Sequence, residues 1–164
     1  MLARSVRVIG LPIRRGFAAA AAPAAQGSAD QLRLTFASPY TALYNNANVK
    51  QVDVPTLAGV VGVLANHVPT IGVLKPGVVQ VTDMDGKVSK YFVSSGTLSM
   101  NIDGSCQVLA EEAIQVDAID ETAARTALEA AQRAQNEGSE KDRAEAGIRA
   151  EVADALLKAV GGAH

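Results

Sequence analysis

The residues of this chain that could support catalysis are few and poorly placed for it. Glu111 and Glu112 could in principle act as general acid and base, but neighbouring residues of a strand point to opposite faces and cannot flank one substrate. His67 is followed by Val68-Pro69, and no histidine, cysteine or acid stands close to it in the sequence. The second histidine, His164, is the last residue. We therefore expect no catalytic residue, no metal site and no cofactor.

Three further patterns have ordinary structural explanations. Asp83, Asp85 and Asp103 are typical turn formers, and their spacing lacks the ligand set of a calcium loop. Gly59-x-x-Gly62 is not followed by the Gly-Lys-Ser/Thr of a phosphate-binding loop. Cys106 is the single cysteine, which excludes an internal disulfide and a cysteine-based zinc site. We interpret it as a small buried strand residue.

The first residues have the composition of a mitochondrial transit peptide. Arg4, Arg7, Arg14 and Arg15 are the only charged residues before Asp30, and aliphatic residues alternate with them. Arg15-Gly16-Phe17-Ala18 resembles a processing site, so we predict a transit peptide over 1–17, cleavage between Phe17 and Ala18, and a flexible leader over 18–29. The alternative is a disordered basic tail on a cytosolic protein.

Charge and hydropathy limit the partners of the mature chain. All 17 acidic residues lie at or beyond Asp30, together with 11 of the 15 basic ones, which leaves an excess of six negative charges. An acidic chain with no Trp and few other aromatic residues argues against a nucleic-acid partner. The longest apolar run, Leu57 to Ala65, has about half the length of a membrane-spanning helix. The sequence therefore predicts a protein of the mitochondrial matrix that reaches a membrane only through a partner.

Short strands and turns dominate residues 30–117. Leu32, Leu34 and Phe36 alternate with polar residues, which places the apolar side chains on one face of a sheet. Asp85-Gly86 and Asp103-Gly104 each separate two strand-like runs and predict hairpins. Turns at intervals of eight to twelve residues favour a β-sandwich or flattened barrel.

Residues 118–164 have a helical period and predict an antiparallel two-helix hairpin. Asp117 or Asp120 can cap the first helix, Asn136-Glu137-Gly138 ends it, and Ser139-x-x-Asp142 opens the second. The second helix places Ile148, Val152, Leu156 and Ala159 on one stripe. Because alanine side chains bury little area, we expect the hairpin to need a partner surface or to move.

The stretch 55–77 combines aliphatic runs with turn residues and carries a family resemblance. Gly59-Val-Val-Gly-Val-Leu-Ala-Asn-His-Val-Pro-Thr70 and then Leu74-Lys-Pro-Gly77 resemble the rotary ATP synthase subunit family called delta in mitochondria and epsilon in bacteria. Lys90–Gly96 and Val108–Ala113 add further matches. The resemblance covers essentially the whole mature chain, and the predicted transit peptide makes it look like the mitochondrial form.

The resemblance implies a non-catalytic part of the central stalk, on the matrix side of the inner membrane. The partners it implies are the gamma subunit, the small mitochondrial epsilon subunit and the ring of c subunits, whose rotation the chain would couple to the catalytic head. It also marks two turns as candidate contacts with these partners, namely Asn66, His67, Val68 and Pro69, and Lys75 and Pro76. The alternative is a freestanding matrix β-sandwich that acts as a binding or adaptor module.

One departure from the family pattern concerns nucleotide binding. Some bacterial relatives bind ATP through a helical motif Ile/Leu-Asp-x-x-Arg-Ala. Here Ile119-Asp120-Glu121-Thr122 is followed by two alanines, and the arginine comes two positions late, at Arg125. Two residues rotate a helical side chain by about 200°. We therefore expect no ATP binding at this motif.

Overall fold

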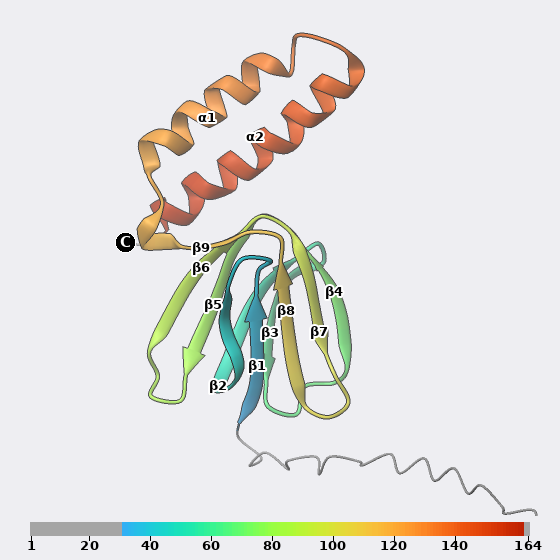
Figure 1. Ribbon diagram of the computed structural model, residues 1–164, viewed down its shortest axis with the longest axis vertical. Coiled ribbons are helices and arrows are strands. Elements are labelled where there is room, and N and C mark those ends of the chain that lie inside the picture. The colour runs from blue at the N-terminus through green and yellow to red at the C-terminus, as the bar shows by residue number, and fades with distance from the viewer. Residues whose placement is uncertain (1–30, 163–164) are drawn as a thin grey trace, which may run out of the picture.

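The computed structural model describes residues 31–162, which form a β domain followed by two helices (Figure 1). The predicted transit peptide (1–17), its processing site at Phe17 and Ala18, and the predicted leader (18–29) lie outside the described residues. The predicted fold class, a β-sandwich followed by an antiparallel two-helix hairpin, is confirmed.

The described residues contain nine strands, one short 3-10 helix and two α-helices. The strands are β1 (Leu32–Ala37), β2 (Ala42–Thr56), β3 (Gly59–Leu64), β4 (Thr70–Leu74), β5 (Gly77–Asp83), β6 (Val88–Val93), β7 (Gly96–Met100), β8 (Ser105–Ala110) and β9 (Ala113–Gln115). They are followed by η1 (Val116–Ala118), α1 (Glu121–Ala134) and α2 (Glu140–Gly161). The boundary that we predict between 117 and 118 falls inside η1.

Strand β2 belongs to both layers of the sandwich. Its first half pairs with β1, and its second half pairs with β3 on one edge and with β5 on the other. The register against β1 shifts after Leu34, where the facing segment of β2 contains Asn46 with a positive φ of 50°. The other strands continue from β1 through β8, β7 and β4, and from β5 through β6 to β9. β1 and β8 form the one parallel pair among the described strands.

The two predicted hairpins are confirmed. β5 and β6 are joined around Asp85-Gly86, where the backbone N–H of Gly86 donates to the carbonyl of Asp83 at 2.9 Å. β7 and β8 are joined around Asp103-Gly104. Both glycines have a φ near +80°, a conformation that side chains with a Cβ rarely adopt, so the sequence fixes these turns locally.

The core of the sandwich is aliphatic and β-branched. The predicted alternation in the first strand is confirmed, because Leu32, Leu34 and Phe36 are all fully buried. The Phe36 ring packs edge-on against the Tyr91 ring, with centroids 5.5 Å apart. The same cluster also contains Val49, Val52, Val54, Val63, Leu74, Val79, Val81, Val93, Leu98, Met100, Cys106, Val108 and Ala110.

The helices begin and end close to where the sequence predicts. Asp120, rather than Asp117, caps α1, and its carboxylate accepts hydrogen bonds from the backbone N–H groups of Thr122 and Ala123. Ser139 and Asp142 form the predicted capping box of α2. Figure 1 shows the hairpin at one end of the sandwich, with the C-terminal part of α2 closest to the strands.

The four residues of the stripe predicted on the second helix differ in how far they are buried. Ala159 is buried, but Val152 and Leu156 are half-buried beside the sandwich, and Ile148 is 64% exposed. The buried residues of the two helices are instead all alanines: Ala124, Ala131, Ala146, Ala150, Ala153 and Ala159. Small residues let the two helices approach closely, while Val152 and Leu156 of α2 lie beside residues of the sandwich.

Candidate partner-binding surfaces

Strand β4 separates the two segments that the sequence marks as candidate contacts. Its first residue, Thr70, pairs with Met100, and its last residue, Leu74, pairs with Gly96. Five residues of extended chain span about 15 Å. Asn66–Pro69 and Lys75-Pro76 are therefore neighbours in the sequence but lie at opposite ends of the sandwich.

Within residues 31–162, three loops form the end of the sandwich that lies away from the hairpin, and we call this end the base. These loops are 65–69, 84–87 and 101–104. Each carries an exposed apolar side chain, namely Val68 (69% exposed), Met84 (45%) and Ile102 (92%). The base thus presents apolar side chains at the tips of loops whose strands are held in the core.

The 65–69 loop has a defined conformation. Asn66 has a positive φ of 61°, and the backbone N–H of His67 donates to the carbonyl of Leu64 at 3.2 Å. The Val68 carbonyl lies 2.9 Å from Nδ1 of His67 and accepts from the Thr70 hydroxyl, also at 2.9 Å. His67 is half-buried, whereas Asn66, Val68 and Pro69 are exposed. These local contacts hold the Asn66–Pro69 loop in one conformation.

Lys75 and Pro76 lie at the hairpin end, where the chain passes from β4 to β5. The backbone N–H of Lys75 donates to the carbonyl of Pro55 at 3.1 Å, which continues the ladder beyond β4. Pro76 lines a cavity shared with Ile148, Val152 and Leu156 of α2. The Lys75-Pro76 corner therefore belongs to the junction between the sandwich and the hairpin.

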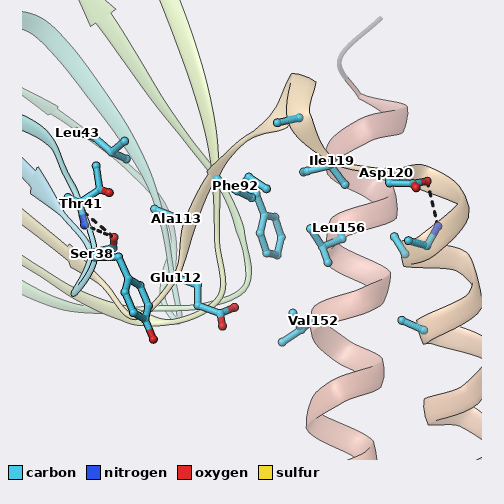
Figure 2. Close-up of a pocket in the computed structure, with 16 residues that line it drawn as sticks. Ser38, Thr41, Leu43, Phe92, Glu112, Ala113, Ile119, Asp120, Val152 and Leu156 are labelled. Atoms are coloured by element: carbon cyan, nitrogen blue, oxygen red, sulfur yellow. Dashed lines mark hydrogen bonds between the residues drawn. The ribbon is translucent and has the colours of Figure 1, made fainter.

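A largely apolar cleft separates the hairpin from the sandwich (Figure 2). Its volume is about 680 Å³. Figure 2 shows Phe92 of β6 lying between the strands and the α2 side chains Val152 and Leu156, with Ile119 beside them. Phe92 is only 4% exposed but lies outside the core of the sandwich, so the helix covers it. The hairpin is thus held against the sandwich by apolar contact.

Polar groups at the rim of this cleft are mostly engaged in turns and caps. Ser38 and Thr41 bond to each other across the β1–β2 turn, where the Ser38 backbone N–H donates to the Thr41 carbonyl at 2.8 Å. Asp120 is committed to the cap of α1. Glu112 lines the cleft without a role in either turn. We find no arrangement of nucleophile, acid and base among these groups.

The acid pair Glu111-Glu112 does not lie on a strand as expected, because β8 ends at Ala110. Both residues are exposed in the connection to β9, and the Glu111 carboxylate accepts a hydrogen bond from the Ser95 hydroxyl at 2.7 Å. Cys106 is fully buried, as expected, and burial raises the pKa of its thiol to about 12. Within residues 31–162, no three His, Cys, Asp or Glu side chains gather in a group that could hold a metal ion.

The segment that corresponds to the bacterial nucleotide motif is occupied by helix-capping contacts. The carboxylate of Asp120 accepts from the backbone at 2.8 and 3.1 Å. Arg125 donates to the carboxylate of Glu121 at 2.8 Å, one turn earlier in the same helix. Both charged side chains are therefore used within α1.

The structure adds exposed apolar residues that we did not identify from the sequence. Val60 and Leu64 lie on the outer face of β3, and Ile71 and Val73 lie on that of β4, with exposed fractions between 49% and 84%. Their period-two spacing is visible in the sequence, but both faces of these strands carry apolar residues, so the pattern does not distinguish core from surface. None of the helices formed by the described residues has the length and apolar character needed to cross a membrane.

Comparison with known proteins gives a consistent result for the sandwich. The family model described as "ATP synthase, Delta/Epsilon chain, beta-sandwich domain" matches residues 31–116. A Caenorhabditis elegans protein named "ATP synthase subunit delta, mitochondrial" is 69% identical over 159 residues, which cover 97% of each chain. A protein of the same name from Yarrowia lipolytica is 41% identical over 143 residues, 87% of this chain and 85% of its own.

Two solved structures extend the similarity beyond the sandwich. A chain of the Euglena gracilis mitochondrial ATP synthase, solved as "OSCP/F1/c-ring", matches with a TM-score of 0.75 and 28% identity over 80% of this chain and 82% of its own. A chain of the Tetrahymena thermophila "central stalk/cring" structure matches with a TM-score of 0.57 over 79% of this chain and 96% of its own. At 14% identity, the second likeness concerns the fold alone.

Proposed function

The chain belongs to the delta/epsilon family of ATP synthase subunits, and we propose that it is a non-catalytic subunit of the central stalk of mitochondrial ATP synthase. In this role it lies on the matrix side of the inner membrane and turns with the ring of c subunits. Through the gamma subunit it couples rotation of that ring to the catalytic head. The observation that carries the proposal is the 69% identity to a mitochondrial delta subunit over 97% of both chains.

The two ends of the sandwich support a division of contacts. We assign the base, with Asn66, His67, Val68 and Pro69, to the ring of c subunits. We assign the hairpin end, with Lys75, Pro76 and the apolar cleft, to the other stalk subunits, gamma and the small epsilon subunit. The cleft supports this assignment because its half-buried and exposed apolar residues lie where a further polypeptide could cover them.

A transmission role needs stiffness, which the sandwich provides. Its two layers share β2, its core is fully buried, and four of its turns contain local backbone hydrogen bonds. Torque applied at one end can therefore pass to the other with little deformation, since packed cores have low compressibility.

Native gel electrophoresis of affinity-tagged chain from mitochondria tests the main proposal. A stalk subunit migrates with the whole ATP synthase, and depletion of the chain lowers oligomycin-sensitive ATP synthesis. A freestanding adaptor migrates as a small species and leaves ATP synthesis intact, which would overturn the proposal.

The substitution His67→Ala tests the role of the base. We expect it to weaken attachment of the stalk to the c-ring more than it lowers the melting temperature of the isolated chain. Lys75→Ala, at the opposite end of β4, is the matched control and should leave the ring contact unchanged. Equal losses of assembly and melting temperature for His67→Ala would favour a purely structural role.

We also propose that the chain does not sense ATP through the start of α1. Asp120 and Arg125 already serve the helix, and Arg125 stands two positions later than in the bacterial motif. Isothermal titration with ATP should give no heat of binding. Micromolar binding that is abolished by Arg125→Ala would overturn this proposal.

A further inference from the structure

The outer face of β2 and β3 contains a carboxylate in an unusual setting. Asp53 of β2 stands directly opposite Gly62 of β3. A Cβ built on Gly62 would lie 3.0 Å from Oδ1 of Asp53, so the carboxylate leans over the glycine, into the space where a side chain would otherwise stand. The side-chain amide of Gln51 donates to the same oxygen at 2.7 Å. The carboxylate is thus held in one orientation and points toward β3.

Among residues 31–162, no cation lies close enough to Asp53 to neutralise its charge. Asp53 pairs across the sheet with Gln80 of β5, and Gln80 pairs in turn with Lys90 of β6. Lys90 is therefore two strand spacings away, about 10 Å, and forms no ion pair with Asp53. Val60 and Leu64, two positions to either side of Gly62, are 71% and 49% exposed.

On the other side of Gly62 lies an open strand edge. β3 pairs with β2 along one edge and has no partner strand along the other within the described part of the chain. Exposed edges of soluble proteins usually carry charged residues or proline that block strand addition. The segment from Leu57 to Ala65 has neither. The open edge therefore offers the backbone of six residues of β3. Beside it lie two exposed apolar side chains, Val60 and Leu64, and the oriented carboxylate of Asp53.

We propose that the β3 edge binds an extended segment of another stalk subunit, one that places an arginine or lysine opposite Gly62. The added strand would pair with β3 by backbone hydrogen bonds. Because the carboxylate of Asp53 already lies over Gly62, a cation from the added strand has to cross only about one strand spacing, 5 Å, to reach it. Apolar residues two positions before and after the cation would cover Val60 and Leu64. The proposal rests on the stalk function above and identifies one of its contacts.

A second copy of this chain fits the same edge less well. Pairing of β3 with β3 would bring two uncharged segments together, since Leu57 to Ala65 contains no basic residue. Asp53 would then stay unpaired in a buried interface, which is costly. Charge complementarity therefore favours a partner with a basic residue in an extended apolar segment.

Site-specific photocrosslinking within the purified ATP synthase tests this inference. A photoreactive residue replaces Val60 in one variant and, as a control on the other layer, the exposed Gln107 of β8 in a second. We expect the Val60 variant to crosslink to a stalk subunit within an extended segment that contains Arg or Lys. No crosslink, a crosslink to a second copy, or a crosslink to a segment without a basic residue would overturn the proposal.

A set of charge variants provides an independent readout. Asp53→Asn should weaken retention of the chain in the complex about tenfold, and Asp53→Lys should weaken it further. Glu137→Gln, the same acid-to-amide change at the tip of the hairpin, is the matched control and should have no effect. Unchanged retention for Asp53→Lys would overturn the inference. If the wild-type chain itself did not purify with ATP synthase, the proposed function would have failed instead.

Discussion

The sandwich and the hairpin are stabilised in different ways. The sandwich buries large aliphatic and aromatic side chains from all parts of residues 32–110. The hairpin buries only alanines between its helices, and each of the five ion pairs in its described residues joins positions four apart in one helix. Exposed pairs of this kind contribute little, about 0.3–0.5 kcal/mol each.

Because of this difference, we expect the sandwich to be stable by its own core and the hairpin to need contacts with other parts of the structure. Burial of a Leu or Phe side chain contributes about 2–3 kcal/mol, whereas a methyl group contributes less than 1. Two larger apolar residues of α2, Val152 and Leu156, line the cleft between the hairpin and the sandwich. The hairpin therefore depends for much of its order on what lies against this face, which is the sandwich and, in the function proposed above, a stalk partner as well.

The largest expected effect comes from the core of the sandwich. Phe36→Ala should lower the free energy of unfolding by about 3–5 kcal/mol, because Phe36 is fully buried and packs against Tyr91. Urea denaturation followed by far-ultraviolet circular dichroism measures it. Ile102→Ala, at a 92% exposed position, should change stability by less than about 0.5 kcal/mol. Similar values for both would contradict the packing described here.

An intermediate effect is expected at the buried alanines of α1 and α2. Ala150→Leu should destabilise the hairpin by about 1–3 kcal/mol, since this alanine is buried and a larger side chain would have to displace its neighbours. Hydrogen exchange should speed up in α1 and α2 but not in the strands of the core. Ala130→Leu on the exposed face of α1 is the control. Faster exchange throughout the sandwich as well would show that the two regions unfold as one unit.

A smaller effect should follow loss of the cap of α1. Asp120→Ala removes the acceptor for two backbone N–H groups and should cost the hairpin about 1 kcal/mol. The loss of helical signal on heating measures it. Asp117→Ala removes an acid three residues earlier that does not cap α1 and should be close to neutral. Equal effects of the two would mean that charge, rather than the cap, matters there.

The smallest expected effect concerns the loss of stability at low pH, which involves Asp142 in the hairpin and Asp103 in the sandwich. Hydrogen bonds from Ser139 hold the pKa of Asp142 below its usual 3.8, and those from Ser105 lower the pKa of Asp103. When folding lowers the pKa of a carboxyl group, its charged form stabilises the folded state. This stabilisation is complete above the pKa of the unfolded state and is lost as the pH falls through the pKa of the folded state. Asp142→Asn should flatten the acid response of the hairpin below pH 4, while that of the sandwich persists. An unchanged hairpin response would contradict this assignment.

The sequence predicts most strongly where local chemistry decides the structure. Asp85-Gly86, Asp103-Gly104 and the Ser139–Asp142 capping box each define a turn or cap within four residues, and all three are present. The sequence did not reveal that β2 bends to join both layers, because the bend depends on pairing with strands far along the chain. It also did not show which face of α2 lies against the sandwich, since valine, leucine and alanine all fit a buried stripe.

The candidate contacts are limited in the same way. The turn residues of Asn66–Pro69 and Lys75-Pro76 are evident in the sequence, but their separation by the length of β4 is a property of the register with β7. The Asp53 site was not predicted either. It depends on the pairing of Asp53 with Gly62, and nothing within either strand indicates that pairing.

The parallel pairing of β1 with β8 has a consequence for the time course of folding. Arg33 of β1 aligns with Ser105 of β8, which is 72 residues later in the sequence. The layer that contains β1 therefore cannot form until the chain between these two strands has brought them together. Such distant contacts form slowly, on the order of milliseconds to seconds, whereas an isolated helix forms in about a microsecond. We therefore expect a full-length chain that refolds from denaturant to contain transient helices at its C-terminal end well before β1 pairs with β8.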